Sequence, residues 1–180
     1  KIDIRTKELI EKICTIYPYP DVSVTQRIDD SIVDEMTALD MCVEVAISER
    51  PITCIRKRRT FKTEDNKKGY TVVSSKMYPQ GDKEKYWFGY RDKRFEDIED
   101  CDEQYMILGC RNKTLSVVRF PREFIEQNLG MLNTSVNSET GEISHYHIVI
   151  FKNPDGKMTM LLSKPALREI DISDYVVGEI

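Results

Sequence analysis

Tyr86-Trp87-Phe88-Gly89-Tyr90-Arg91 brings four aromatic side chains into five consecutive positions, between a basic turn and an acidic loop. Side chains of a β-strand alternate between the two faces of its sheet. The two tyrosines and the phenylalanine would therefore share one face, while Trp87, Gly89 and Arg91 would share the other. We predict a central strand whose first face lies in the core and whose second face forms a platform.

Strand-like runs with short polar connections surround this stretch. Residues 52–63 and 70–78 are joined by the polar loop 64–69, and with 85–91 they would form an antiparallel meander. A helix is expected from Pro121 to about Leu132, since proline suits the first helical position. Further strands are predicted over 105–110, 114–120, 145–151, 158–162 and around 168–172, with 95–103 as an acidic loop and 133–144 as a flexible connection.

This pattern predicts an α+β fold, in which a mostly antiparallel curved sheet or half-open barrel of about seven to eight strands carries one inserted helix. Two N-terminal helices would precede it, over 6–16 and from Asp30 or Ser31 to just before Pro51. We therefore divide the chain into a helical N-terminal segment, 1–50, and an antiparallel sheet domain, 51–180. The two helices either pack on the sheet domain or belong to a preceding domain, and the sequence leaves both possibilities open.

The composition is that of an ordinary globular protein, with 40% hydrophobic and 32% charged residues. No apolar run is long enough to cross a bilayer and no signal peptide opens the chain, so we expect a cytoplasmic protein without membrane contact. The five cysteines are widely spaced and form no CxxC pair, which indicates reduced thiols. Because the first residue is Lys1 and not methionine, we expect a fragment of a larger protein.

Charge is distributed unevenly along the chain. Residues 51–95 carry 13 basic and 5 acidic side chains, although the whole chain has a net charge of −4. A basic segment within an acidic chain is typical of contact with a polyanion. The alternative is that cations on an edge strand only prevent edge-to-edge aggregation. We expect phosphates to be held by Arg56, Arg58, Arg59, Lys62 and Lys76.

The selective contacts are expected on the platform face. Trp87 is the only tryptophan and would stack on an unpaired base, with a place in the core as the alternative. Arg91 lies on the same predicted face. His145 and His147 are the only histidines, and their spacing on a strand aims both at one face. We expect both histidines to contact the ligand, with structural hydrogen bonding as their alternative role.

No cofactor or catalytic motif occurs in the sequence, and we expect neither a cofactor nor a metal. Two histidines are too few for a metal centre, and no cysteine or carboxylate stands at a diagnostic spacing from them. The acid-x-Lys matches to a metal-dependent nuclease pattern, Asp65-Asn66-Lys67 and Asp155-Gly156-Lys157, fall in polar turns. A small metal-dependent nuclease or phosphodiesterase is therefore the least favoured alternative.

The aromatic spacing in four stretches, Lys85–Tyr90, Tyr105–Cys110, His145–Ile148 and Ile170–Ile172, resembles that of uncharacterised accessory modules in bacterial restriction and mobile-defence proteins. The resemblance covers about residues 70–178. It implies a DNA-facing module that accompanies a nuclease or helicase domain of the same protein, and it carries over no catalytic residues.

The leading hypothesis is a nucleic-acid-binding module, with DNA favoured, of a larger restriction or nuclease-type protein. The alternative is a protein-interaction or scaffolding domain, whose basic strands meet an acidic partner or the chain's own acidic helices. A homodimer is compatible with this alternative.

Overall fold

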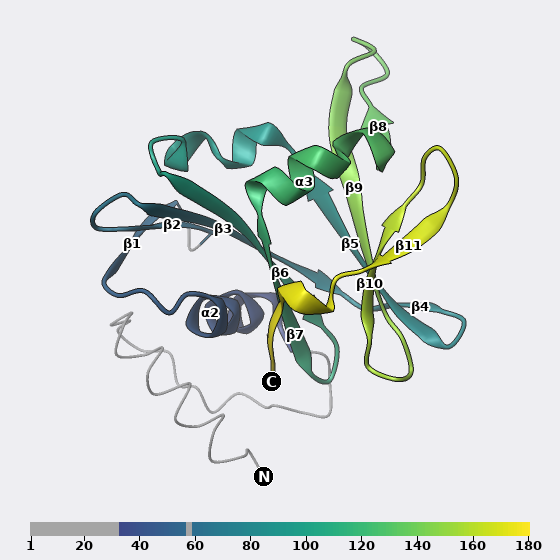
Figure 1. Ribbon diagram of the computed structural model, residues 1–180, viewed down its shortest axis with the longest axis horizontal. Coiled ribbons are helices and arrows are strands. Elements are labelled where there is room, and N and C mark those ends of the chain that lie inside the picture. Colours follow the sequence, from purple (N-terminus) through teal and green to yellow (C-terminus); the bar gives the residue numbers. More distant parts are fainter. Residues whose placement is uncertain (1–32, 57–58) are drawn as a thin grey trace.

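The computed structural model describes residues 33–56 and 59–180, which form two β-sheets of six strands each and two α-helices (Figure 1). In the first sheet the order is β1-β2-β3-β6-β7-β12, with bounds Ile52–Arg56, Thr60–Thr63, Lys68–Lys76, Glu103–Arg111, Leu115–Pro121 and Val176–Glu179. In the second sheet the order is β11-β10-β9-β5-β4, with bounds Arg168–Asp171, Met158–Leu162, Ile143–Lys152, Lys83–Tyr90 and Tyr78–Gln80. Strand β8 (Asn133–Val136) pairs with β9 in the second sheet.

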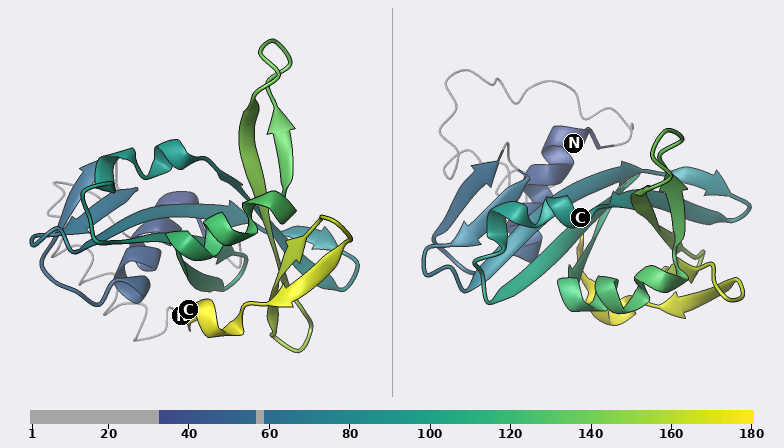
Figure 2. Two further views of the ribbon diagram at one scale, coloured as in Figure 1. Left: turned by 45° about the horizontal axis from the view of Figure 1, so that its top comes forward. Right: turned by 90° about the horizontal axis from the view of Figure 1, so that it is seen from above.

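The first sheet is covered on both faces. Helix α2 (Glu35–Ala46) lies against one face, and α3 (Arg122–Asn128) lies on the opposite side (Figures 1 and 2). Helix α2 buries Leu39 and Cys42 against Phe61 and Ile107 of the first sheet. A second and larger core fills the space between the two sheets, as well as under α3. The second predicted helix therefore exists and packs on the sheet domain, whereas the one predicted over 6–16 lies outside the described residues.

The aromatic strand is β5, and its alternation is confirmed. Tyr86, Phe88 and Tyr90 are at most 3% exposed and belong to the core between the sheets. Trp87 is 39% exposed on the other face, so the alternative of a core tryptophan is wrong. Strand β5 pairs with β9 along its length, which places Gly89 opposite His147. The platform face of β5 thus continues onto the histidine strand.

The predicted meander is wrong, because β5 belongs to a different sheet from β2 and β3. Strand β3 pairs with β2 on one side and runs parallel to β6 on the other, with Val72 opposite Ile107. The reason is that β3 is apolar on both faces: Val72 is buried beneath α2, while Val73 is buried between the sheets. A strand buried on both faces suits the interior of a covered sheet, where parallel pairing is common.

The described part of the chain also has more strands than the sequence predicted, twelve in two sheets instead of about seven to eight in one curved sheet or half-open barrel. The run predicted over 52–63 is divided into two strands, β1 and β2, which pair antiparallel with each other. The connection 133–144 contains β8, whose hairpin with β9 projects from the body of the protein (Figures 1 and 2). Strand β12 was not predicted, and β4 lies where a turn was expected.

The inserted helix exists, but it begins at Arg122, one residue later than predicted, with Pro121 as its N-cap. Its α-helical part is also shorter, since a 3₁₀ turn (Leu129–Met131) completes it. Two further 3₁₀ turns, Asp92–Arg94 and Glu96–Ile98, follow β5, and Ile98 is fully buried in the acidic loop. No helix in the described ranges has the length and apolar character needed to span a membrane.

Candidate nucleic-acid interface

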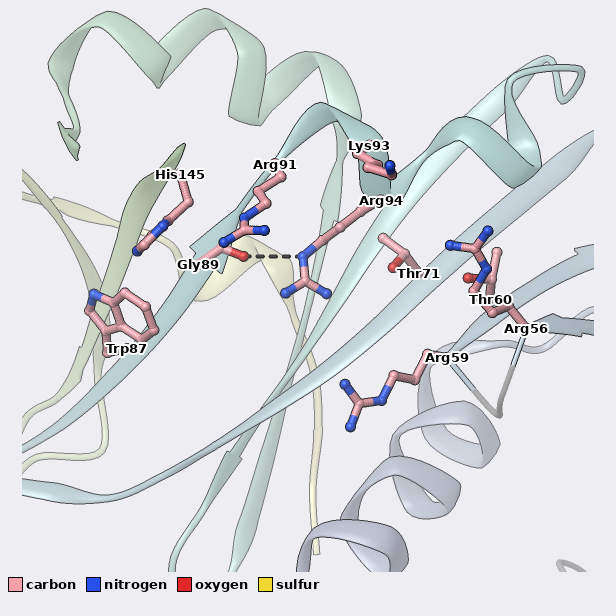
Figure 3. Close-up of a pocket in the computed structure, with 10 residues that line it drawn as sticks. All are labelled: Arg56, Arg59, Thr60, Thr71, Trp87, Gly89, Arg91, Lys93, Arg94 and His145. Atoms are coloured by element: carbon pink, nitrogen blue, oxygen red, sulfur yellow. Dashed lines mark hydrogen bonds between the residues drawn. The ribbon is translucent and has the colours of Figure 1, made fainter. Parts of the chain in front are cut away.

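An open groove of about 380 Å³ lies where the two sheets meet, and we call it the arginine groove (Figure 3). One wall comes from β1, β2 and β3 of the first sheet, and the other from β5, β9 and the turn after β5. Its lining consists of Arg56, Arg59, Thr60, Thr71, Trp87, Gly89, Arg91, Lys93, Arg94 and His145. Five of these ten side chains are cationic at neutral pH, and the groove contains no carboxylate of its own.

Arg94 lies at the centre of this charge. The 3₁₀ turn after β5 carries its side chain back over the strand, where its Nε donates a hydrogen bond of 3.1 Å to the Gly89 carbonyl. In Figure 3 the two terminal nitrogens of this guanidinium point into the groove. Burial lowers the pKa of Arg94, and the nearby charges of Arg59 and Arg91 lower it further. The fold therefore holds three guanidinium groups close together against their mutual repulsion.

The charges on the groove are only partly neutralised by the protein. Arg59 forms an ion pair of 2.9 Å with Glu35, in the first turn of α2, and Arg56 forms one of 2.9 Å with Asp97. Within the described ranges neither Arg91 nor Arg94 forms an ion pair with a carboxylate. The two arginines of the groove that have no ion pair in the described ranges are thus beside β5, next to the exposed tryptophan.

The aromatic end of the groove is a cluster of three rings. Trp87 makes edge contacts with His145 and His147, at centroid distances of 5.5 and 5.3 Å. The two imidazoles stack on each other at 5.2 Å. His147 is in turn hydrogen-bonded to Ser135 of β8, with 2.8 Å between its Nε2 and the serine Oγ. The projecting hairpin therefore fixes the rings that hold the indole in place.

Gly89 leaves space between the tryptophan and the arginines. A Cβ atom built at this position would lie 3.4 Å from the Trp87 ring and 3.4 Å from the His145 ring. Any side chain here would therefore occupy the floor of the groove. The absence of a side chain at Gly89 joins the aromatic and cationic ends into one continuous surface.

The structure brings together some of the residues predicted to bind nucleic acid and separates others. Arg56, Arg59, Trp87, Arg91 and His145 all line the arginine groove. His147 contacts the indole but is not among the residues that line the groove.

Two of the predicted phosphate ligands lie away from the groove lining. Lys62 forms an ion pair of 2.9 Å with Asp100, and Lys76 lies at the far end of β3 with its ammonium over the Tyr78 ring. Arg58 lies outside the described residues.

Sequence reasoning missed Lys93 and Arg94, although both stand in the basic run Arg91-Asp92-Lys93-Arg94 directly after the aromatic strand. Only a turn that reverses the chain brings Arg94 back beside Gly89. Three basic residues within four positions after a platform strand were the available signal.

The described residues hold no group of three His, Cys, Asp or Glu side chains arranged to bind a metal ion. Asp65 and Asp155 of the two acid-x-Lys matches instead accept hydrogen bonds from backbone N–H groups of their own turns, at 3.1 and 3.0 Å. These carboxylates act as turn residues in the structure.

Comparison of the chain with models of protein families, with curated proteins and with solved structures gives no significant match.

Proposed function

We propose that the protein is a nucleic-acid-binding module that holds an unpaired segment of the strand in the arginine groove. The observation that carries this proposal is the position of an exposed tryptophan in the same groove as Arg91 and Arg94, which lack ion-pair partners in the described ranges. Guanidinium groups bind phosphate oxygens through paired hydrogen bonds, and an indole face stacks on any base. A nucleic acid provides both groups at short range.

The shape of the site favours unpaired over duplex nucleic acid. Proteins that read duplex DNA insert a protruding helix or ribbon into its grooves. Here the cations line a concave surface at the junction of two sheets, and Trp87 lies within it. A base that is still paired and stacked cannot offer its face to an indole, whereas a single strand or an extruded base can.

The ion pairs of Arg56 and Arg59 do not oppose this function. The side chains of both arginines are at least half exposed. Exposed pairs of this kind contribute only about 0–1 kcal/mol, so a phosphate can replace the carboxylate at little cost. The scaffolding alternative gains from the same pairs, because they show that the basic strands do meet the chain's own carboxylates.

The test is fluorescence anisotropy of labelled single-stranded DNA, duplex DNA and single-stranded RNA at low and high salt. We expect binding that prefers single strands and weakens steeply with salt, because cation release accompanies each phosphate contact. Trp87→Ala should weaken binding by about 1–3 kcal/mol. The matched control is Arg168→Gln, which removes an exposed charge on β11, outside the groove. Flat curves at low salt with all three ligands would refute the proposal.

The link to restriction proteins, the neighbouring nuclease or helicase domain and the homodimer stay predictions. Size-exclusion chromatography with light scattering tests the scaffolding alternative directly. A salt-sensitive dimer that has no affinity for nucleic acid would favour it over the binding module.

A further inference from the structure

We infer that the arginine groove is a site for a single nucleotide unit, with its phosphate held by Arg59, Arg91 and Arg94 and its base placed against Trp87. This inference rests on the proposed function and specifies its ligand. The smallest molecule that the site recognises would be a nucleoside monophosphate, or one such unit within a strand.

The cationic end of the groove has the chemistry of a phosphate site. Arg94 is fixed by its hydrogen bond to the Gly89 carbonyl, so its terminal nitrogens are oriented before any ligand arrives. Arg59 and Arg91 lie near enough to lower its pKa, in addition to the effect of burial. A bound phosphate would offset the repulsion among the three groups and accept several charged hydrogen bonds at once.

An unsatisfied polar group lies in a pocket that Arg94 also lines. A smaller pocket of about 150 Å³ shares Arg59, Trp87, Gly89 and Arg94 with the arginine groove. Its wall includes Ser74, whose buried hydroxyl has no hydrogen-bond partner among the described residues. Buried polar groups are normally paired, so this hydroxyl is a further candidate contact for a polar atom of the ligand.

The aromatic and cationic ends of the groove are separated by a short length of chain. Trp87 and Gly89 occupy alternate positions on β5, and Arg91 follows directly after the strand in extended conformation. Four residues of extended chain span about 13 Å. Gly89 keeps the space between indole and guanidinium open. A base and its own phosphate, joined through one sugar, can occupy both ends of such a short surface.

Carboxylates next to the arginine groove limit the length of strand whose phosphates it can hold. Glu35 and Asp97 pair with its arginines at the edge, and Asp100 holds Lys62 outside it. Lys76 lies at the far end of β3 and does not line the groove. In the described part of the chain, a second phosphate would therefore find only Lys93 among the other lining cations without an ion pair, because Arg56 is paired and neither Lys62 nor Lys76 lines the groove. Neighbouring phosphates of a long strand would contribute little to the affinity.

The experiment uses the full chain and its own fluorescence, since Trp87 is the only tryptophan. Deoxyadenosine 5′-monophosphate, deoxyadenosine and inorganic phosphate are titrated separately. We expect saturable quenching by the monophosphate and at least about tenfold weaker binding of the nucleoside, which lacks the charged hydrogen bonds. Inorganic phosphate should compete with the monophosphate. Equal affinity for nucleoside and monophosphate would overturn the inference.

Two variants test the assignment of residues. Arg94→Gln should weaken monophosphate binding at least about tenfold, and Arg94→Lys should restore only part of it, because a lysine keeps the charge but not the planar fork. Arg91→Gln replaces an exposed side chain and gives the same test should Arg94→Gln fail to fold. Monophosphate binding by a folded Arg91→Gln or Arg94→Gln protein at wild-type strength would refute the site, whereas Arg168→Gln should bind as the wild type does.

The outcomes separate this inference from the proposed function. If oligonucleotides bind but the monophosphate causes no saturable quenching, the single-nucleotide site is wrong and the nucleic-acid module stands. If the monophosphate binds but oligonucleotides do not, the site stands and the module is wrong.

Discussion

Replacing Glu35 by glutamine should strengthen the binding of single-stranded nucleic acid. Glu35 begins helix α2, where it pairs with Arg59 at 2.9 Å and lines the smaller pocket beside Arg94. Its carboxylate therefore competes with the phosphate of a ligand for the same guanidinium. The substitution keeps the size of the side chain and removes only the charge.

The size of the effect follows from two contributions. Both partners of the pair are 50% exposed, so breaking it costs a ligand about 0.2–1 kcal/mol. Removing a negative charge about 7 Å from a bound phosphate adds about 0.6 kcal/mol at the dielectric constant of water. Together these terms predict an affinity that is about four- to fifteenfold higher at low salt. The gain should shrink as salt screens the second contribution.

Anisotropy titrations of a labelled single strand at two salt concentrations measure this change. Asp100→Asn is the matched control, since it also removes an exposed carboxylate from an ion pair with a strand cation, Lys62, that does not line the groove. We expect this control to stay within about twofold of the wild type.

Glu35→Gln should lower the free energy of unfolding although it raises the affinity for nucleic acid. An acidic residue in the first turn of a helix contributes about 0.3–1 kcal/mol, which the variant loses. Competition between Glu35 and the ligand is refuted if Glu35→Gln binds no more tightly than the wild type, or if Asp100→Asn gains as much affinity as Glu35→Gln.

Three further results are expected. Gly89→Val should fill the floor of the groove and weaken strand binding at least about tenfold, with an unchanged circular dichroism spectrum; wild-type affinity would contradict the position of the ligand. Burial and nearby positive charge lower the pKa of His145. The free energy of unfolding should therefore fall as the pH drops below about 6.5, because the unfolded chain then binds a proton more readily. Urea titrations at several pH values should show a smaller fall for His145→Gln than for the wild type. Burial opposes ionisation of Glu49, but hydrogen bonds, chiefly from Lys68, lower its pKa to about 2. Its stabilising effect is therefore complete above the ordinary glutamate range and lost as the pH falls towards 2, so Glu49→Gln should flatten the acid part of the stability curve.

The faces of β5 could be predicted from sequence, because one strand buried on one face obeys a local rule of alternation. The neighbours of β3 in the sheet could not be predicted in this way. Val72 and Val73 of β3 are both buried, and an apolar run of this kind does not say whether its neighbour is the next strand or β6. The parallel pairing joins residues more than thirty positions apart, and it depends on how α2 and the second sheet cover the two faces.

Some residues of the candidate site could likewise be predicted from sequence, and others could not. Arg56, Arg59 and Trp87 were predictable because charge and aromatic character are visible in composition. The difference between Arg59 and Lys62 was not, since both belong to one basic segment and only the folded chain places Asp100 beside the lysine. The position of Arg94 beside Gly89 depends on the 3₁₀ turn after β5, and composition does not predict this turn.

The two walls of the arginine groove differ in how their strands are held. Arg56 is on β1, which forms the edge of the first sheet and pairs only with β2. Trp87 is on β5, which pairs with β9 on one side, and the Trp87 backbone N–H donates a hydrogen bond to the Ser75 hydroxyl of β3 on the other. Amide hydrogens of an edge strand exchange with deuterated solvent faster than those of an interior one. Exchange should therefore be slow beside the indole and rapid beside Arg56, so that a molecule spanning both walls would slow it mainly along β1.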